Sequence, residues 1–413
     1  SYMIAIIEKV YQFLWGDWIV LPLPGGSSFR LSLLVLILIP AGIWFTIRTR
    51  FLPIRLFPDM LHALFEKKGK EEGESHNSTL SALQTLIVST ATRVGMGNLV
   101  GVVAAISAGG AGAVFWMWVT ALIGSSTAFV EATLAQIYKE KDPVYGGYRG
   151  GPAYYMHRFI QEKRGGKKKR YVGISVLFAI SGLICWCGIS QVISNSVTSA
   201  FHNAFHIPPI YTTVVLVALA AVIIFRKTAT VKVLDVLVPV MAGCYFLITV
   251  ILICMNFSAL PGVFSRIFEE AFGIRQAVAG GLGTVVMNGV KRGLFSNEAG
   301  SGSAPCAAAA AESNQPVKLG LTQALGVFID TIVICSCTAM IMLLTPESLT
   351  EGAVGMELLQ VAMGYHLGQF GVIFIAATLW LFSFSTFLGI LYYARSNISY
   401  LFGDGMLPQN LYK

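Results

Sequence analysis

The sequence predicts an all-α membrane protein that crosses the bilayer several times and contains two discontinuous helices. Of its 413 residues, 55% are hydrophobic and only 12% are charged, and the mean hydropathy is +0.69. Apolar stretches of about 20 residues, the length of a membrane-spanning helix, recur along the chain. Two of these stretches are interrupted by glycines and polar residues that a plain spanning helix does not need.

Composition excludes several other classes. The first residues carry Glu8, Lys9 and Asp17, which indicates an amphipathic lead-in and not a cleavable signal peptide. The net charge is +8, but the basic residues collect in a few loops, which indicates membrane topology and not nucleic-acid binding. The seven cysteines lie in apolar stretches, where cysteine behaves as a small hydrophobe, so we expect no metal centre and no redox cofactor.

Nine candidate spans divide the chain into three parts. Residues 1–82 form an N-terminal amphipathic segment, a peripheral span and a cytoplasmic loop. Residues 83–256 hold five spans and residues 257–413 hold three. The spans are residues 31–47, 83–108, 113–137, 172–195, 209–225, 233–255, 275–300, 319–344 and 369–393.

The distribution of lysine and arginine predicts the orientation. The loop after the first span carries six of them, and the loop after the third carries ten between Lys139 and Arg170. The alternate connections 196–208 and 345–367 carry none. Basic loops remain in the cytoplasm, so the sequence predicts a multi-pass protein of the cell membrane with its N-terminus outside.

The first interruption lies at Val94–Asn98 in the second span. Three glycines fall within seven residues there, next to Arg93. Each glycine costs about 1 kcal/mol relative to alanine in a helix interior, and a charge near the bilayer centre is costly unless it is paired or faces water. A discontinuous helix whose freed backbone groups bind a ligand or ion explains these residues. A glycine-lined packing face is the alternative, but it leaves Arg93 and Asn98 unexplained.

The second interruption lies in the stretch that begins at Gly280, which is too rich in glycine and polar residues to cross as one rod. Arg93 and Asn98 have counterparts in Arg292 and Asn297, at the same spacing. Paired interruptions in two halves of a chain indicate a transporter binding site. The first half enters the membrane from the cytoplasm and the second from outside, which predicts inverted repeats.

The second repeat is shorter than the first by two spans. Either this repeat is incomplete or about two further helices follow Lys413. We expect the latter, with Leu407–Asn410 forming a loop that leads onward.

Four motifs occur in a recognisable order: Val94–Gly101 (VGMGNLVG), Gly109–Trp118 (GGAGAVFWMW), Tyr148–Tyr155 (YRGGPAYY) and Leu294–Ser303 (LFSNEAGSGS). Together they resemble the alanine/glycine:cation symporter family, the sodium:alanine symporters. The resemblance implies a LeuT-like fold, with five plus five helices in inverted repeats after one extra N-terminal span. It implies uptake of alanine or glycine with sodium, no enzymatic activity, and no cofactor besides the coupling ion. Met96 departs from many relatives, which carry a small or hydroxyl residue there.

The interruptions suit a zwitterionic substrate. Amides of Gly97 and Asn98, at the positive end of a half-helix, suit its carboxylate, while carbonyls near Gly95 suit its ammonium. The predicted substrate-binding residues are Gly95, Met96, Gly97, Asn98, Gln191, Phe295, Ser296 and Asn297. Phe295, by similarity to the LeuT-like pattern, would cap the pocket. Gln191 equally suits an interhelical hydrogen bond.

A sodium site is expected at the ninth span. The hydroxyls of Ser385 and Thr386, with the carbonyl of Phe382 one turn earlier, offer hard oxygen ligands. The alternative is that these hydroxyls bond to their own helix. The resemblance adds the carbonyls of Ala91 and Val94.

Three charges lie in apolar surroundings: Arg93, Glu131 and Asp330. Structural pairing, for example of Arg93 with Glu298 or Asp330, is one explanation. Titration of a carboxyl group is the other, and it supports a proton-coupled amino-acid transporter of the same fold as the alternative function. The expected partners are therefore alanine or glycine, sodium and membrane lipid. The sequence indicates no oligomeric state.

Overall fold

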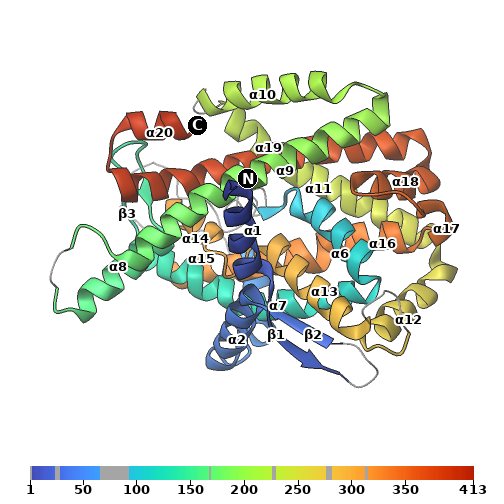
Figure 1. The fold of residues 1–413 in the computed structure, drawn as a ribbon, viewed down its shortest axis with the longest axis horizontal. Coiled ribbons are helices and arrows are strands. Elements are labelled where there is room, and N and C mark those ends of the chain that lie inside the picture. Colours follow the sequence, from blue (N-terminus) through green and yellow to red (C-terminus); the bar gives the residue numbers. More distant parts are fainter. Residues whose placement is uncertain are drawn as a thin grey trace.

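The computed structural model describes residues 2–23, 28–65, 93–166, 169–225, 229–275, 281–311 and 315–413. The described chain is mostly helical, as the sequence predicts (Figure 1). Its N-terminal part contains α1 (Tyr2–Trp15), the antiparallel strands β1 (Asp17–Pro22) and β2 (Ser28–Ser32), α2 (Leu33–Arg48), α3 (Leu52–Arg55) and α4 (Phe57–Phe65).

Five helical segments are long and apolar enough to cross a membrane in the part of the chain that the structure describes. They are α7 (Gly112–Ile137), α9 (Gly173–Phe205), Val236–Met255 within α11 (Ala229–Met255), Pro316–Leu343, and α19 (Gln369–Phe402). Pro316–Leu343 comprises α15 (Pro316–Val327), η3 (Phe328–Cys335) and α16 (Ser336–Leu343). Shorter apolar segments are α2, α10 (Pro209–Phe225) and Gly97–Gly109, which joins η1 (Gly97–Gly101) to α6 (Val102–Gly109).

Each predicted span contains a helix in the part that the structure describes. The stretch 275–300 contains α13 (Gly281–Asn297), which is followed by α14 (Ser303–Ala310). Of the stretch 83–108, only residues 93–108 are described, and they include η1 and α6.

Shorter elements gather at the two ends of the long helices (Figure 1). One end carries β3 (Glu140–Lys141), β4 (Tyr148–Arg149), α8 (Pro152–Lys163) and α20 (Met406–Tyr412). The other end carries η2 (Phe257–Ala259), α12 (Leu260–Ala271), α17 (Glu347–Thr350) and α18 (Met356–Leu367). The predicted loop at Leu407–Asn410 is wrong, because these residues lie within α20.

Close packing between α7 and α13 explains two of the glycines after residue 280, Gly289 and Gly293. A Cβ atom at Gly289 would lie 2.5 Å from the carbonyl oxygen of Ala113, and one at Gly293 would lie 3.1 Å from Cβ of Thr120. Small residues allow such close helix approach in a membrane. The stretch that begins at Gly280 does not cross as one rod, as expected, but its helix is continuous over Gly281–Asn297 and the break follows Asn297.

The first interrupted segment lies in the middle of a large hydrophobic cluster. Val94, Met96 and Leu99 pack there with buried side chains of α9, α11, α18 and α19. In Figure 1, α9 and α19 run side by side across the molecule, and residues of the two helices contact one another. The packed helices thus hold the interrupted segment away from solvent.

Candidate functional site

The first interruption is present where the sequence predicts it. Between the helical residue Arg93 and η1, residues Val94–Met96 lie outside any helix. The side chain of Asn98 stabilises the bend, because its Oδ1 accepts a hydrogen bond of 2.9 Å from the amide of Gly95. The carbonyl of Gly95 accepts the amide of Asn98 at 3.2 Å. This carbonyl, expected to be free, therefore has a local partner.

The second interruption lies at residues 298–302, later than the segment that resembles the first one. Glu298, Gly300 and Gly302 have positive φ angles of 54°, 84° and 84°, which end α13. Phe295, Ser296 and Asn297 therefore form the last turn of a helix and are not part of the break itself.

The ends of the two interrupted helices face one another. A Cβ atom at Gly97 would lie 3.3 Å from Cα of Ser296, and one at Gly101 would lie 3.5 Å from Cδ1 of Phe295. Ser296 is buried, whereas Phe295 is 37% exposed. The structure thus brings Gly97 together with Phe295 and Ser296, and the Phe295 ring is the accessible part of this contact.

The other predicted substrate contacts have different surroundings. The side chain of Met96 lies in the hydrophobic cluster, and its amide donates a hydrogen bond of 3.3 Å to Oγ1 of Thr386. Asn297 lies next to α7, where a Cβ atom at Gly124 would be 3.5 Å from its Nδ2. Gln191 is exposed on α9, while Ile193 of the same helix is buried. The structure therefore gives no support to Gln191 as a substrate contact.

Four of the five predicted sodium ligands lie together. Oγ of Ser385 donates a hydrogen bond of 3.2 Å to the carbonyl of Val94. Oγ1 of Thr386 donates a hydrogen bond of 2.9 Å to the carbonyl of Phe382. This is the hydrogen bond within the same helix that was the alternative to a sodium site. Ala91, the fifth predicted ligand, lies outside the described residues.

Asp330 connects the two interrupted helices. This fully buried residue of η3 accepts a hydrogen bond of 2.8 Å at Oδ1 from Nδ2 of Asn98. At Oδ2 it accepts hydrogen bonds from Oγ of Ser296 at 3.2 Å and from Oγ1 of Thr331 at 3.1 Å. The side chain of Asn98 thus bonds to Asp330 of η3 through Nδ2 and to the amide of Gly95 through Oδ1.

Arg93 binds neither carboxylate proposed for it. Its guanidinium donates hydrogen bonds of 2.8 Å to the carbonyl of Asn297, at the C-terminal end of α13, and to Oε1 of Gln323. Cations stabilise a helix C-terminus because they lie near its negative end. Within the described residues Arg93 forms no direct ion pair with Glu298 or Asp330. Its charge still attracts both carboxylates, so the suggested pairing acts over a longer distance and not as a contact.

Two carboxylates support the second interruption instead. Oε2 of Glu131, on α7, accepts a hydrogen bond of 3.1 Å from the amide of Gly300. Oε2 of Glu298 accepts hydrogen bonds from Ser303 at 2.8 Å and from Tyr393 at 3.2 Å. Sequence reasoning noted both carboxylates but not these partners.

Two polar residues near the site, Thr338 and Gln323, were not predicted from the sequence. Oγ1 of Thr338 donates a hydrogen bond of 2.8 Å to the carbonyl of Asn98 and contacts the hydroxyl of Tyr245 at 2.8 Å. Gln323 binds Arg93 as described above. The only signal that could have found Thr338 and Gln323 is that each is a polar residue within an apolar span.

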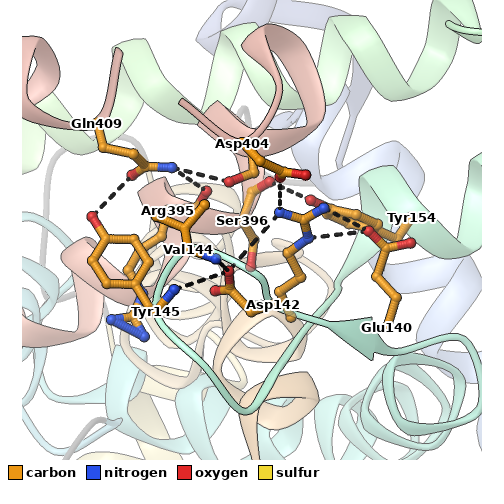
Figure 2. Close-up of polar contacts among 11 residues, drawn as sticks. Glu140, Asp142, Val144, Tyr145, Tyr154, Arg395, Ser396, Asp404 and Gln409 are labelled. Carbon is orange, nitrogen blue, oxygen red and sulfur yellow. Dashed lines mark hydrogen bonds and ion pairs between the residues drawn. The ribbon is translucent and has the colours of Figure 1, made fainter. Parts of the chain in front are cut away.

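A polar cluster lies away from this site, at the end of the molecule that carries β3 and α20 (Figure 2). Arg149 donates a hydrogen bond of 2.9 Å to Glu140 and forms an ion pair with Asp404. Asp142 approaches the same guanidinium at 4.0 Å. The cluster joins the β3–β4 loop to the connection between α19 and α20.

Comparison with known proteins gives consistent matches along the chain. The sequence model of the sodium:alanine symporter family matches residues 25–413. The amino-acid carrier protein AlsT of Bacillus subtilis is 43% identical over 379 residues, which cover 91% of this chain and 77% of that protein. The probable sodium/glutamine symporter GlnT of the same organism is 43% identical over 374 residues, with coverage of 90% and 75%.

A more distant relative and a solved structure extend the comparison. The sodium/alanine symporter AgcS of Methanococcus maripaludis is 33% identical over 404 residues, which cover 97% of this chain and 84% of that protein. A mutant of the Eremococcus coleocola manganese transporter has a similar fold, with a TM-score of 0.55 at 11% identity, over 85% of this chain and 72% of that one. At this identity the likeness concerns the fold alone.

Proposed function

Because this chain belongs to the sodium:alanine symporter family, and is thus a multi-pass amino-acid symporter and not an enzyme, we propose that it carries alanine or glycine into the cell together with sodium. The observation that carries the proposal is the meeting of the two interrupted helices, where Gly97 approaches Ser296 beside the accessible ring of Phe295. Transporters with discontinuous helices bind their substrates at such junctions.

The substrate would lie against the first interruption. The amide of Gly97, at the start of the half-helix, would receive its carboxylate, because a helix N-terminus carries a partial positive charge. The amide of Asn98 already donates to the carbonyl of Gly95. The ring of Phe295 would limit the space for the side chain, which favours alanine and glycine over larger amino acids.

Sodium would bind between Val94, Phe382, Ser385 and Thr386. The hydroxyls of Ser385 and Thr386 already contact the two carbonyls. On sodium binding these hydroxyls would turn their hydrogens away and present oxygen lone pairs to the ion, together with the two carbonyl oxygens. Oxygen ligands of this kind suit hard cations. One sodium ion that crosses ~100 mV supplies about 2.3 kcal/mol, enough for roughly 50-fold accumulation of the substrate.

We also propose a LeuT-like arrangement of five plus five helices and a location in the cell membrane, with the basic end in the cytoplasm. Lys139, Arg149, Arg158 and Lys163 lie on or beside β3, β4 and α8, at the same end as α20 (Figure 1). This agrees with the tendency of basic loops to remain in the cytoplasm.

The decisive experiment is uptake of labelled alanine by liposomes that contain the purified protein. An inward sodium gradient is compared with an equal potassium gradient, each at two external pH values. Accumulation that requires sodium and ignores the pH step supports the proposal. Accumulation that follows the pH step without sodium would favour proton coupling, the alternative, with Asp330, Glu131 or Glu298 as the titrating group.

Competition defines the substrate. Glycine should compete with alanine, and glutamine tests the second candidate that the similarity to GlnT suggests.

The Phe295→Ala variant should admit competitors with larger side chains such as leucine, because the ring no longer fills the space. Phe257→Ala, at an exposed position of η2, is the matched control and should leave selectivity unchanged. Unaltered selectivity in Phe295→Ala would remove Phe295 from the pocket.

A further inference from the structure

The hydroxyl of Thr338 bonds to the first interrupted segment and not to its own helix. Threonine hydroxyls in membrane helices usually donate to a carbonyl one turn earlier in the same helix. The hydroxyls of Thr322, in α15, and Thr345, just after α16, do so. Thr338 is fully buried in α16 and instead donates a hydrogen bond of 2.8 Å to the carbonyl of Asn98 in η1. This difference indicates that Thr338 serves the interrupted segment.

Tyr245 of α11 supports this hydrogen bond. Its hydroxyl oxygen lies 2.8 Å from Oγ1 of Thr338. Because the single hydroxyl hydrogen of Thr338 is already donated to Asn98, the hydroxyl of Tyr245 is the donor of this second bond. Tyr245 is fully buried in the hydrophobic cluster around the first interruption. The hydrogen bonds thus run from α11 through α16 to η1, and each bond polarises the next.

The conformation of Asn98 determines where the amide of Gly97 points. Glycine has no side chain that could anchor it, so the residue that follows must hold its position. The side chain of Asn98 bonds to Asp330 through Nδ2 and to the amide of Gly95 through Oδ1. Its backbone carbonyl is held by the hydroxyl of Thr338. The amide proposed to receive the carboxylate of the substrate therefore depends on a hydroxyl from another span.

We infer that Thr338, supported by Tyr245, is a positioning residue that keeps the interrupted segment in the conformation that receives the amino acid. The inference rests on the proposed function, because it concerns the same substrate site. Loss of the hydroxyl leaves the buried carbonyl of Asn98 without this donor, which is unfavourable, so the segment populates other conformations. The apparent affinity for alanine then falls in proportion to the competent fraction. Bound alanine holds the segment in place, so the rate at saturation is retained.

The test measures alanine uptake by liposomes under an inward sodium gradient, as a function of the alanine concentration. Thr338→Val removes the hydroxyl and nearly keeps the shape of the side chain. It should raise the half-maximal alanine concentration roughly 10-fold and leave the maximal rate per protein molecule unchanged. Thr338→Ser keeps a hydroxyl and should behave almost as the unmodified protein does.

Thr322→Val is the matched control. It removes a buried hydroxyl from the same span, but this hydroxyl donates to the carbonyl of Lys318 in its own helix. The half-maximal alanine concentration and the maximal rate should therefore both stay unchanged.

Tyr245→Phe separates the support from the direct contact. It removes the donor to Thr338 and leaves the bond from Thr338 to Asn98, so it should raise the half-maximal alanine concentration less, about 3-fold. The double variant with Thr338→Val should be no worse than Thr338→Val alone, because Tyr245 acts through Thr338. Tyr245→Phe also decides the question if Thr338→Val does not fold, since a wild-type half-maximal concentration in Tyr245→Phe would overturn the inference.

Other results would also overturn the positioning role. They are an unchanged half-maximal alanine concentration in Thr338→Val, an equal rise in Thr322→Val, and a failure of Thr338→Ser to restore the unmodified value. A fall in the maximal rate alone would assign Thr338 to a later step of transport and overturn its role in substrate binding. No alanine uptake by the unmodified protein would instead refute the proposed function, and the inference with it.

Discussion

Gly95 shows how a single missing Cβ atom shapes the proposed sodium site. A Cβ atom at this position would lie 2.3 Å from Oγ1 of Thr386 and 3.6 Å from the carbonyl oxygen of Phe382. The first of these distances is well below van der Waals contact, so Thr386 reaches the bend only because residue 95 is glycine. The sequence indicates that glycine matters here, but it does not show that the neighbour is a residue 291 positions later.

Substitution of Gly95 by alanine should therefore abolish sodium-dependent uptake, or raise the sodium concentration for half-maximal uptake by at least about 10-fold. The added methyl group displaces the hydroxyl of Thr386 from its position between the helices. Sodium titration of alanine uptake in liposomes measures the effect.

Gly188→Ala provides the matched control. Gly188 lies on the exposed face of α9, and a Cβ atom there would meet no other atom within 4 Å, so this change should leave the sodium response unaltered. Equal behaviour of Gly95→Ala and Gly188→Ala would show that the contact with Thr386 has no role in sodium binding.

At the scale of elements, the first interruption could be predicted and the position of the second could not. Polar residues and glycines in an apolar run predicted a break at Val94–Asn98, and the structure has it at Val94–Met96. In the second case the helix continues to Asn297, and the chain leaves it at Glu298, Gly300 and Gly302, which have positive φ angles. The matching spacing of Arg292 and Asn297 indicated a break within α13, but Gly289 and Gly293 of this helix serve close packing against α7.

Arg93 explains how the end of α13 is stabilised inside the protein. It donates to the last carbonyl of that helix, at Asn297, and to Gln323 of α15. Lysine carries the same charge but offers a single nitrogen instead of the planar fork. Arg93→Lys should therefore lose one hydrogen bond to a charged group, worth about 1.5–3 kcal/mol, and should lower the melting temperature of the protein in detergent.

The comparison for this prediction is Arg158→Lys, which changes an exposed arginine of α8 and should leave the melting temperature unchanged. If Arg93→Lys melted at the same temperature as Arg158→Lys, the bridge between α13 and α15 would have no measurable role in stability.

Across the whole molecule, the sequence predicted the membrane-spanning helices but neither the short helices between them nor the side-chain contacts of the candidate site. The apolar runs located the spanning helices because length and hydropathy are local properties. The short helices α8, α12, α18 and α20 lack a run of about 20 apolar residues and were not predicted. The contacts that assemble the candidate site were equally inaccessible, since Asn98 and Asp330 lie 232 positions apart and no sequence pattern links them.

The cluster around Arg149 is a long-range polar connection at the end that carries β3 and α20 (Figure 2). Arg149, only 11% exposed, joins Glu140 and Asp142 to Asp404, which lies 255 positions later. Arg149→Gln leaves all three carboxylates without this cation, whereas Asp404→Asn removes one partner of several. Arg149→Gln should therefore lower the melting temperature more than Asp404→Asn, and the double variant should be less destabilised than the sum of the two.

An exposed ion pair provides a comparison for the loss of stability expected in Arg149→Gln. Arg30 binds Asp17 at 3.5 Å with 67% of the arginine side chain exposed, and pairs of that kind contribute less than about 1 kcal/mol. Arg30→Gln should thus change the melting temperature less than Arg149→Gln. The half-maximal alanine concentration should stay constant in all these variants, because the cluster shares no residue with the interrupted helices. Additive losses in the double variant would show that Arg149 and Asp404 act independently, and the connection between the β3–β4 loop and the end of α19 would then have to rest on packing alone.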